Sequence, residues 1–142
     1  MNLEQIKQDL RKHEGWVPWA YRDSLGYLTI GYGFLVDPTR GGSMPREVGE
    51  FWLNFELQEL EKSRPQWPWW PTIGDARQQV LTCLMYNMGV DKLLTFKNML
   101  AFLAGGNYTA AADELKNSAW YRQVGVDRGD LYCKILQSGE WA

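Results

Sequence analysis

Two acidic side chains near the N-terminus, Glu14 and Asp23, are of the residue types that cleavage of a glycosidic bond requires. Asp23 follows Glu14 by nine residues, and Thr29 follows Asp23 by six. In such a reaction one carboxylic acid protonates the leaving oxygen, and a second carboxylate activates water or stabilises the cation-like transition state. A Glu and an Asp at this spacing also occur by chance in most proteins. A catalytic role for Glu14 and Asp23 is therefore indicated only if the secondary-structure elements around them can hold the two side chains in position.

The first of these elements is a helix predicted over residues 2–13. Its apolar side chains recur at helical spacing, and Asn2 is a suitable N-cap with Gln5 three positions later. Gly15 follows the last turn and can end the helix in a left-handed conformation. Glu14 is therefore expected at the C-terminus of this helix.

Residues 16–36 are rich in strand-forming side chains and predict a small antiparallel sheet. A turn signal at residues 23–26 divides them into two runs, with Asp23 in the turn and Thr29 in the second run. Gly31 and Gly33 interrupt that second run. Glycine inside a strand indicates a bulge or a close approach of the backbone to another group.

The remainder of the chain is predicted to be mostly helical. A loop at residues 37–42 leads to a long helix over about 45–63, followed by a stiff connector rich in Trp and Pro at 66–71. We prefer to read the tryptophans of the connector as a rigid plug between two lobes, although they could also stack on sugars. Further helices are expected over 75–88, from a Thr95 cap through Leu103, after an Asn107 cap, and over about 127–137.

Composition narrows the possible functions. The net charge of −2 argues against a nucleic-acid partner, and a single His excludes a multi-His metal site, so we expect no metal and no cofactor. Cys83 and Cys133 lie in apolar stretches at no metal-ligand spacing and are expected to be buried free thiols. No apolar run is long enough to insert into a membrane, and no secretory signal is visible at the N-terminus.

Three segments together resemble the N-terminal signature of phage-type lysozymes, the endolysins of glycoside hydrolase family 24. They are His13-Glu14-Gly15, Tyr21-Arg22-Asp23-Ser24-Leu25-Gly26 and Leu28-Thr29-Ile30-Gly31-Tyr32-Gly33. The similarity continues in order through Tyr86-Asn87-Met88-Gly89, Ser118-Ala119-Trp120-Tyr121, Arg128 and Gly139-Glu140-Trp141. It therefore covers nearly the whole chain.

The resemblance implies an α+β, lysozyme-like fold in a single domain over residues 1–142. A small N-terminal lobe with a β-hairpin would span about 14–44, a linking helix about 45–63, and a helical C-terminal lobe about 64–142. The helix at 2–13 would pack on the helical lobe. One departure is Phe34, which stands where many members carry His, and we expect it to alter stability rather than activity.

The resemblance also implies roles for the site residues. Glu14, Asp23 and Thr29 match the catalytic positions, with Glu14 as general acid and the other two positioning water. This arrangement inverts the anomeric centre in the family, which predicts carboxyl groups roughly 6.5–9.5 Å apart. Arg128 resembles the Arg that pairs with the catalytic Glu. Weaker candidates for substrate contact, for which core packing or helix capping is about as plausible, are Leu35, Tyr86 and Asn87.

The implied enzyme is an N-acetylmuramidase acting on bacterial peptidoglycan, and a monomer. It would accumulate in the host cytoplasm until a holin releases it to the periplasm, or reach the wall as part of a virion. Two alternatives stay open. A lytic transglycosylase cuts the same glycan with one catalytic Glu, and a non-catalytic module would bind peptidoglycan through its Trp residues.

Overall fold

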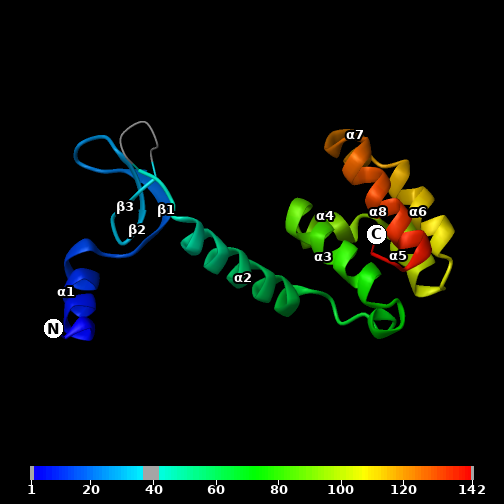
Figure 1. Cartoon of the computed structure of the whole chain (residues 1–142), viewed down its shortest axis with the longest axis horizontal. Coiled ribbons are helices and arrows are strands. Elements are labelled where there is room, and N and C mark those ends of the chain that lie inside the picture. The colour runs from blue at the N-terminus through cyan, green and yellow to red at the C-terminus, as the bar shows by residue number, and fades with distance from the viewer. Residues whose placement is uncertain (1, 37–41, 142) are drawn as a thin grey trace. The chain divides into compact units, whose positions relative to one another are not determined.

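The computed structural model describes residues 2–36 and 42–141. It divides into two compact units, residues 1–52 and 53–142, and the division falls inside a long helix. Most of the predicted loop at 37–42 lies outside the described residues. The architecture is α+β, with a three-stranded antiparallel sheet in the first unit and a bundle of helices in the second, as Figure 1 shows. No helix within the described ranges has the length and hydropathy to cross a membrane.

The first unit begins with helix α1 (Leu3–Glu14), as the sequence predicts. The Asn2 side chain accepts a hydrogen bond from the Gln5 amide and so satisfies one of the free donors of the first turn. Gly15 follows with φ of 70°, and its amide donates to the Arg11 carbonyl. This glycine stop is what leaves Glu14 as the last residue of the helix.

The sheet consists of β1 (Val17–Arg22), β2 (Leu28–Gly31) and β3 (Phe34–Leu35), hydrogen-bonded in that order. Tyr21 pairs with Thr29 across β1 and β2, and Thr29 pairs with Leu35 across β2 and β3. The register of β1 shifts between Val17 and Tyr21, so the strand carries an irregularity before the turn. Thr29 lies on the central strand.

Helix α2 (Arg46–Ser63) has almost the bounds predicted for the linking helix. The Pro45 carbonyl accepts hydrogen bonds from the Val48 and Gly49 amides, so Pro45 caps the helix from just outside it. Beyond Ser63 the Arg64 amide still donates to the Leu60 carbonyl, and Pro65 then prevents a further turn.

The second unit is a set of helices around one apolar core. They are α3 (Asp75–Met88), α4 (Val90–Leu94), α5 (Lys97–Ala104), α6 (Tyr108–Lys116), α7 (Ala119–Val124) and α8 (Val126–Ser138). Its most completely buried side chains include Leu81, Leu84, Leu115, Ile135 and Leu136. Helix α6 packs on both α5 and α8, and α3 packs on α8 (Figure 1).

Two details of this unit correct the sequence-based expectations. Thr95 does not begin a helix: it ends α4, where its hydroxyl donates to the Lys92 carbonyl at 2.7 Å. Phe96 stands at the N-cap of α5 instead, without a side-chain cap. Helices α4 and α7 were not predicted, because five and six residues are too few to show a period.

The Trp-rich connector belongs to the second unit and packs against its core. Trp67 stacks on Trp69 with ring centroids 4.9 Å apart, and the Arg64 guanidinium lies 4.1 Å from the Trp70 ring centroid. The short 3-10 helix η2 (Trp70–Thr72) then leads to α3. A role of this connector as a plug between lobes stays a prediction.

Arg77 ties the start of α3 to the end of α8. Its guanidinium donates to the carbonyls of Ile73, Leu136 and Gln137 at 2.6–3.1 Å. The same group lies 3.5 Å from the ring centroid of Tyr108. A single side chain therefore satisfies terminal carbonyls of a helix that begins about 50 residues later in the chain.

Candidate active site

Glu14 projects from the C-terminus of α1 toward the loop between β2 and β3. A β-carbon placed on Gly33 would lie 2.8 Å from Glu14 Oε2 and 3.5 Å from its carboxyl carbon. Gly33 has φ of 77°, a conformation that residues with side chains rarely adopt. The close approach expected at this glycine is thus confirmed, and the group that approaches is the Glu14 carboxylate.

Asp23 organises the turn between β1 and β2. Its Oδ1 accepts hydrogen bonds from the Leu25 amide at 2.9 Å and the Tyr27 amide at 2.8 Å. The Asp23 backbone closes the turn, with its amide donating to Tyr27 and its carbonyl accepting from Gly26. Oδ2 accepts no hydrogen bond from the part of the chain that the structure describes. The carboxylate is therefore held in the turn through Oδ1.

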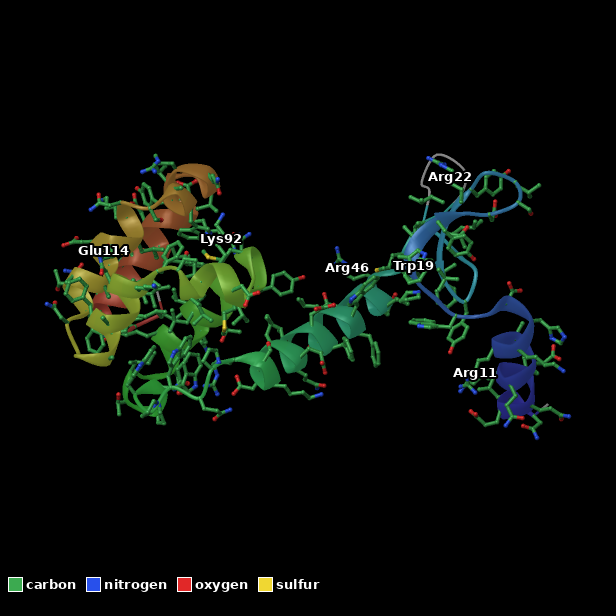
Figure 2. The ribbon with its side chains drawn as sticks, turned by 180° about the vertical axis from the view of Figure 1, so that it is seen from behind. Arg11, Trp19, Arg22, Arg46, Lys92 and Glu114 are labelled. Atoms are coloured by element: carbon green, nitrogen blue, oxygen red, sulfur yellow. The ribbon has the colours of Figure 1, made fainter. Side chains whose placement is uncertain are left out.

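The Asp23 turn is braced from outside by its neighbour. Arg22 lies at the end of β1, and its guanidinium donates to the Gly26 carbonyl at 3.0 Å. Figure 2 labels Arg22 beside the sheet. The contact holds the turn closed without using the Asp23 carboxylate.

Thr29 lies on β2, between the Asp23 turn before this strand and the Gly33 loop after it, which the Glu14 carboxylate contacts. Its side chain is only 2% exposed, and its hydroxyl donates to the Tyr27 carbonyl at 3.0 Å. Because the hydroxyl proton is used in this bond, the oxygen lone pairs remain to accept one from a second partner. Leu35, its cross-strand partner on β3, is partly exposed.

The first unit therefore gathers the three predicted catalytic residues around one strand. The Asp23 turn precedes β2, Thr29 lies on β2, and the loop that follows β2 meets the Glu14 carboxylate. The roles of these residues and the separation of the two carboxyl groups stay predictions.

The second unit holds the other predicted site residues. Tyr86 is exposed on α3. Asn87 Oδ1 accepts a hydrogen bond from Trp120 Nε1 at 2.8 Å, and Trp120 stacks on Tyr132 with ring centroids 5.6 Å apart. Arg128 Nε donates to the Tyr132 hydroxyl at 3.3 Å. The pairing of Arg128 with Glu14, which belongs to the first unit, stays a prediction.

Trp120 and Tyr132 thus connect two of the predicted residues, and sequence reasoning did not single them out for this role. Burial raises the pKa of the Tyr132 hydroxyl, and the hydrogen bond from Arg128 opposes that shift. The hydroxyl consequently stays protonated near neutral pH. The signal that could have found Trp120 is its indole N–H, which seeks an acceptor when the ring is buried.

A groove of about 420 Å³ also opens in the second unit, bordered by α4, α5, α6 and α7. Lys92, Glu114 and Trp120 line it, and Figure 2 labels the first two. None of the predicted substrate residues Tyr86, Asn87 and Arg128 lines this groove. Among the described residues, no three His, Cys, Asp or Glu side chains are grouped so that they could hold a metal ion.

A small sheet whose hairpin meets a glutamate at a helix end, combined with a helical unit, corresponds to the lysozyme-like α+β class. Comparison with known proteins agrees with this class. The phage lysozyme family model matches residues 11–131. The chain belongs to the phage lysozyme family, and it is accordingly a glycoside hydrolase of the lysozyme type that degrades peptidoglycan.

Individual relatives are distant in sequence. The chain is 23% identical to the probable T4-type lysozyme 1 of Dictyostelium discoideum, over 96% of both chains, and 21% identical to the probable T4-type lysozyme 2 of that organism with the same coverage. It is 26% identical to the pre-baseplate central spike protein Gp5 of Enterobacteria phage T4. That match covers 81% of this chain and 24% of the spike protein, so the similarity concerns one part of the larger protein.

Proposed function

We propose that this lysozyme is an N-acetylmuramidase of the family 24 type. It hydrolyses the β-1,4 bond between N-acetylmuramic acid and N-acetylglucosamine, with Glu14 as general acid and with Asp23 and Thr29 positioning water. The observation that carries the proposal is the contact between the Glu14 carboxylate and Gly33, in the loop directly after the strand of Thr29. Family membership supports the reaction class.

The chemistry follows from the oxygen atoms available. The Glu14 carboxyl gives its proton to the glycosidic oxygen as the bond from that oxygen to the anomeric carbon breaks. A water attacks the anomeric carbon from the opposite face and loses a proton to Asp23 Oδ2, because Oδ1 already accepts two backbone amides. Proton exchange with solvent then restores both carboxyl groups.

Thr29 would orient that water by accepting a hydrogen bond from it. Its own proton is committed to the Tyr27 carbonyl, so the hydroxyl can act only as an acceptor toward water. Such a contact aims the lone pairs of the water away from Thr29 and toward the sugar. Leu35, Tyr86, Asn87 and Arg128 remain the proposed substrate-binding residues.

Glu14→Gln tests the acid role. General acid catalysis contributes roughly 100- to 10,000-fold, so the variant should clear chloroform-permeabilised Gram-negative cells at least 100-fold more slowly. Circular dichroism should remain that of the wild type. Glu4→Gln is a matched control, since Glu4 is an exposed acid in the first turn of the same helix, where it pairs with Lys7. Full lysis by Glu14→Gln would remove Glu14 from the mechanism.

Mass spectrometry of the digested peptidoglycan separates the rival reactions. A hydrolase adds one water for each bond cut. A lytic transglycosylase would leave an anhydro product that is lighter by one water. Binding of wild-type protein to cell walls without any release of fragments would instead favour a non-catalytic module. A monomeric state and delivery by a holin or on a virion belong to the same proposal.

A further inference from the structure

Three aromatic side chains gather beside the loop that also meets Glu14: Trp16 just before β1, Tyr32 in the loop and Phe34 on β3. The rings of Trp16 and Tyr32 have centroids 5.0 Å apart, and those of Tyr32 and Phe34 are 6.3 Å apart in an edge-on arrangement. Gly31 lies beneath two of them. A β-carbon at Gly31 would be 2.9 Å from Phe34 and 3.5 Å from Trp16. The absence of a side chain at Gly31 therefore lets these rings settle on the backbone.

The outer rings of this aromatic cluster are open to solvent. Trp16 is 61% exposed and Phe34 is 58% exposed, while Tyr32 between them is partly buried. Single exposed apolar side chains are ordinary on protein surfaces, whereas contiguous exposed apolar patches mark binding sites. Trp19 provides the contrast within the same unit, because it is 67% exposed and pairs with no other aromatic ring among the described residues.

We propose that the aromatic cluster of Trp16, Tyr32 and Phe34 binds the glycan strand of peptidoglycan, with the apolar face of one sugar ring against the Trp16 indole. This inference rests on the proposed function, since it assigns a sugar position beside the proposed acid. One face of a pyranose ring presents C–H groups that suit an aromatic surface. Tyr32 supports the indole from the side, and Phe34 closes the edge of the platform.

The position of the cluster favours a glycan over other occupants. The Phe34 and Trp16 rings pack on the backbone of Gly31, and the Glu14 carboxylate packs on the backbone of Gly33, two residues later. A glycan chain bound on the rings would therefore pass directly beside the Glu14 carboxylate, the proposed acid. The platform consists of only three rings, whereas a specific protein–protein interface usually buries at least about 1,200 Å². A flexible polymer needs only a small platform next to the point of cleavage.

Binding is best measured in the Glu14→Gln background, where the polymer is not consumed. Purified, insoluble peptidoglycan sacculi serve as the probe, and the protein left in solution after sedimentation gives the affinity. Adding Trp16→Ala should weaken binding roughly three- to tenfold, the range expected for the loss of one aromatic contact. Trp16→Tyr should retain most of the affinity because it keeps an aromatic face.

Trp19→Ala is the matched control, since it removes an equally exposed indole from the same strand region. It should bind sacculi as tightly as Glu14→Gln alone. In the otherwise wild-type enzyme, most of the loss caused by Trp16→Ala should appear in KM, as expected for a residue that binds the ground state and the transition state alike.

The proposal would be overturned if the Trp16→Ala and Trp19→Ala proteins bound sacculi with the same affinity, whether that affinity stayed at the level of Glu14→Gln alone or fell equally in both. Either result is distinguishable from failure of the proposed function. If the chain were no muramidase, the wild type would release no muropeptides, whatever its affinity for sacculi. If only the platform were wrong, the wild type and Trp16→Ala would digest peptidoglycan with the same KM.

Discussion

Glu14 Oε2 lies 2.8 Å from the point where a β-carbon on Gly33 would be. These residues are 19 positions apart in the chain, at the end of a helix and in a hairpin loop. The space that a glycine leaves at position 33 is therefore occupied by the proposed acid itself. Any side chain at this position must displace the carboxylate.

Gly33→Ala should consequently impair activity more than stability alone explains. Alanine at a positive φ costs about 1–2 kcal/mol of folding free energy. Gly106→Ala carries the same backbone penalty, because Gly106 has φ of 75° but a β-carbon there would meet nothing within 4 Å. Thermal unfolding should thus shift similarly in both variants, while muropeptide release falls only in Gly33→Ala. Equal activity in the two would show that the Glu14 carboxylate tolerates displacement.

Asp23 has a structural role in its turn and a proposed chemical role, and two substitutions separate them. Asp23→Asn keeps an oxygen that can accept the Leu25 and Tyr27 amides, so the variant should fold with nearly wild-type stability and lose most activity. Asp23→Ala also removes the two hydrogen bonds, which should lower the free energy of unfolding by about 1–2 kcal/mol. Chemical denaturation and a turbidity assay measure the two effects. An active Asp23→Asn enzyme would confine Asp23 to its structural role.

Thr29 allows opposite predictions for stability and activity. Thr29→Ser removes one buried methyl group, at a cost of about 1 kcal/mol, but keeps the hydroxyl and should retain activity. Thr29→Val keeps the shape and loses the acceptor for water. Its stability should change little, because the Tyr27 carbonyl still accepts the Asp23 amide. Its rate should fall on the order of 100-fold. A valine variant as fast as the serine variant would rule out the water-orienting role.

Cys133 should be unreactive in the folded protein. Its side chain is buried in the core of the second unit, and desolvation raises the pKa of the thiol from 9.0 to about 11. Below about pH 9 both folded and unfolded chains keep the proton, so the thiol adds no pH dependence there. Between pH 9 and pH 11 the unfolded chain releases its proton first, and the folded state loses stability.

Two measurements follow from this pKa shift. At about pH 8, a thiol reagent should label Cys133 only after denaturant is added, with Cys133→Ala as the blank. From pH 9 to about pH 11, the free energy of unfolding of the wild type should fall more steeply than that of Cys133→Ala. Rapid labelling of native Cys133 would mean that the core opens on the timescale of the reaction.

The sequence predicts best what is periodic or locally hydrogen-bonded. Helix α3 has the bounds expected from its apolar spacing, Asn2 caps α1 as predicted, and Asn107 caps α6 by accepting the Ala110 amide. Thr95 shows the limit of such reasoning. A threonine side chain suits either end of a helix, and here Thr95 is the C-cap of the unpredicted helix α4, directly after its last residue Leu94.

Contacts between distant positions were the least predictable part of the site. The spacing of Glu14 and Asp23 indicates the chemistry, but nothing in it says which loop the Glu14 side chain meets. Gly33 signalled only that some group approaches closely. Likewise Asn87 and Trp120 are 33 residues apart, and their hydrogen bond arises from tertiary packing, in which α3 and α7 both pack on α8 and which no local pattern encodes.

The three carbonyl contacts of Arg77 also have a consequence for how the protein is made. Two of its acceptors, on Leu136 and Gln137, follow it by 59 and 60 residues. The ribosome must synthesise those residues before the Arg77 guanidinium can exchange its hydrogen bonds to water for those to the Leu136 and Gln137 carbonyls. The helical unit therefore cannot mature helix by helix during translation, and nascent chains should stay sensitive to protease until that segment has emerged.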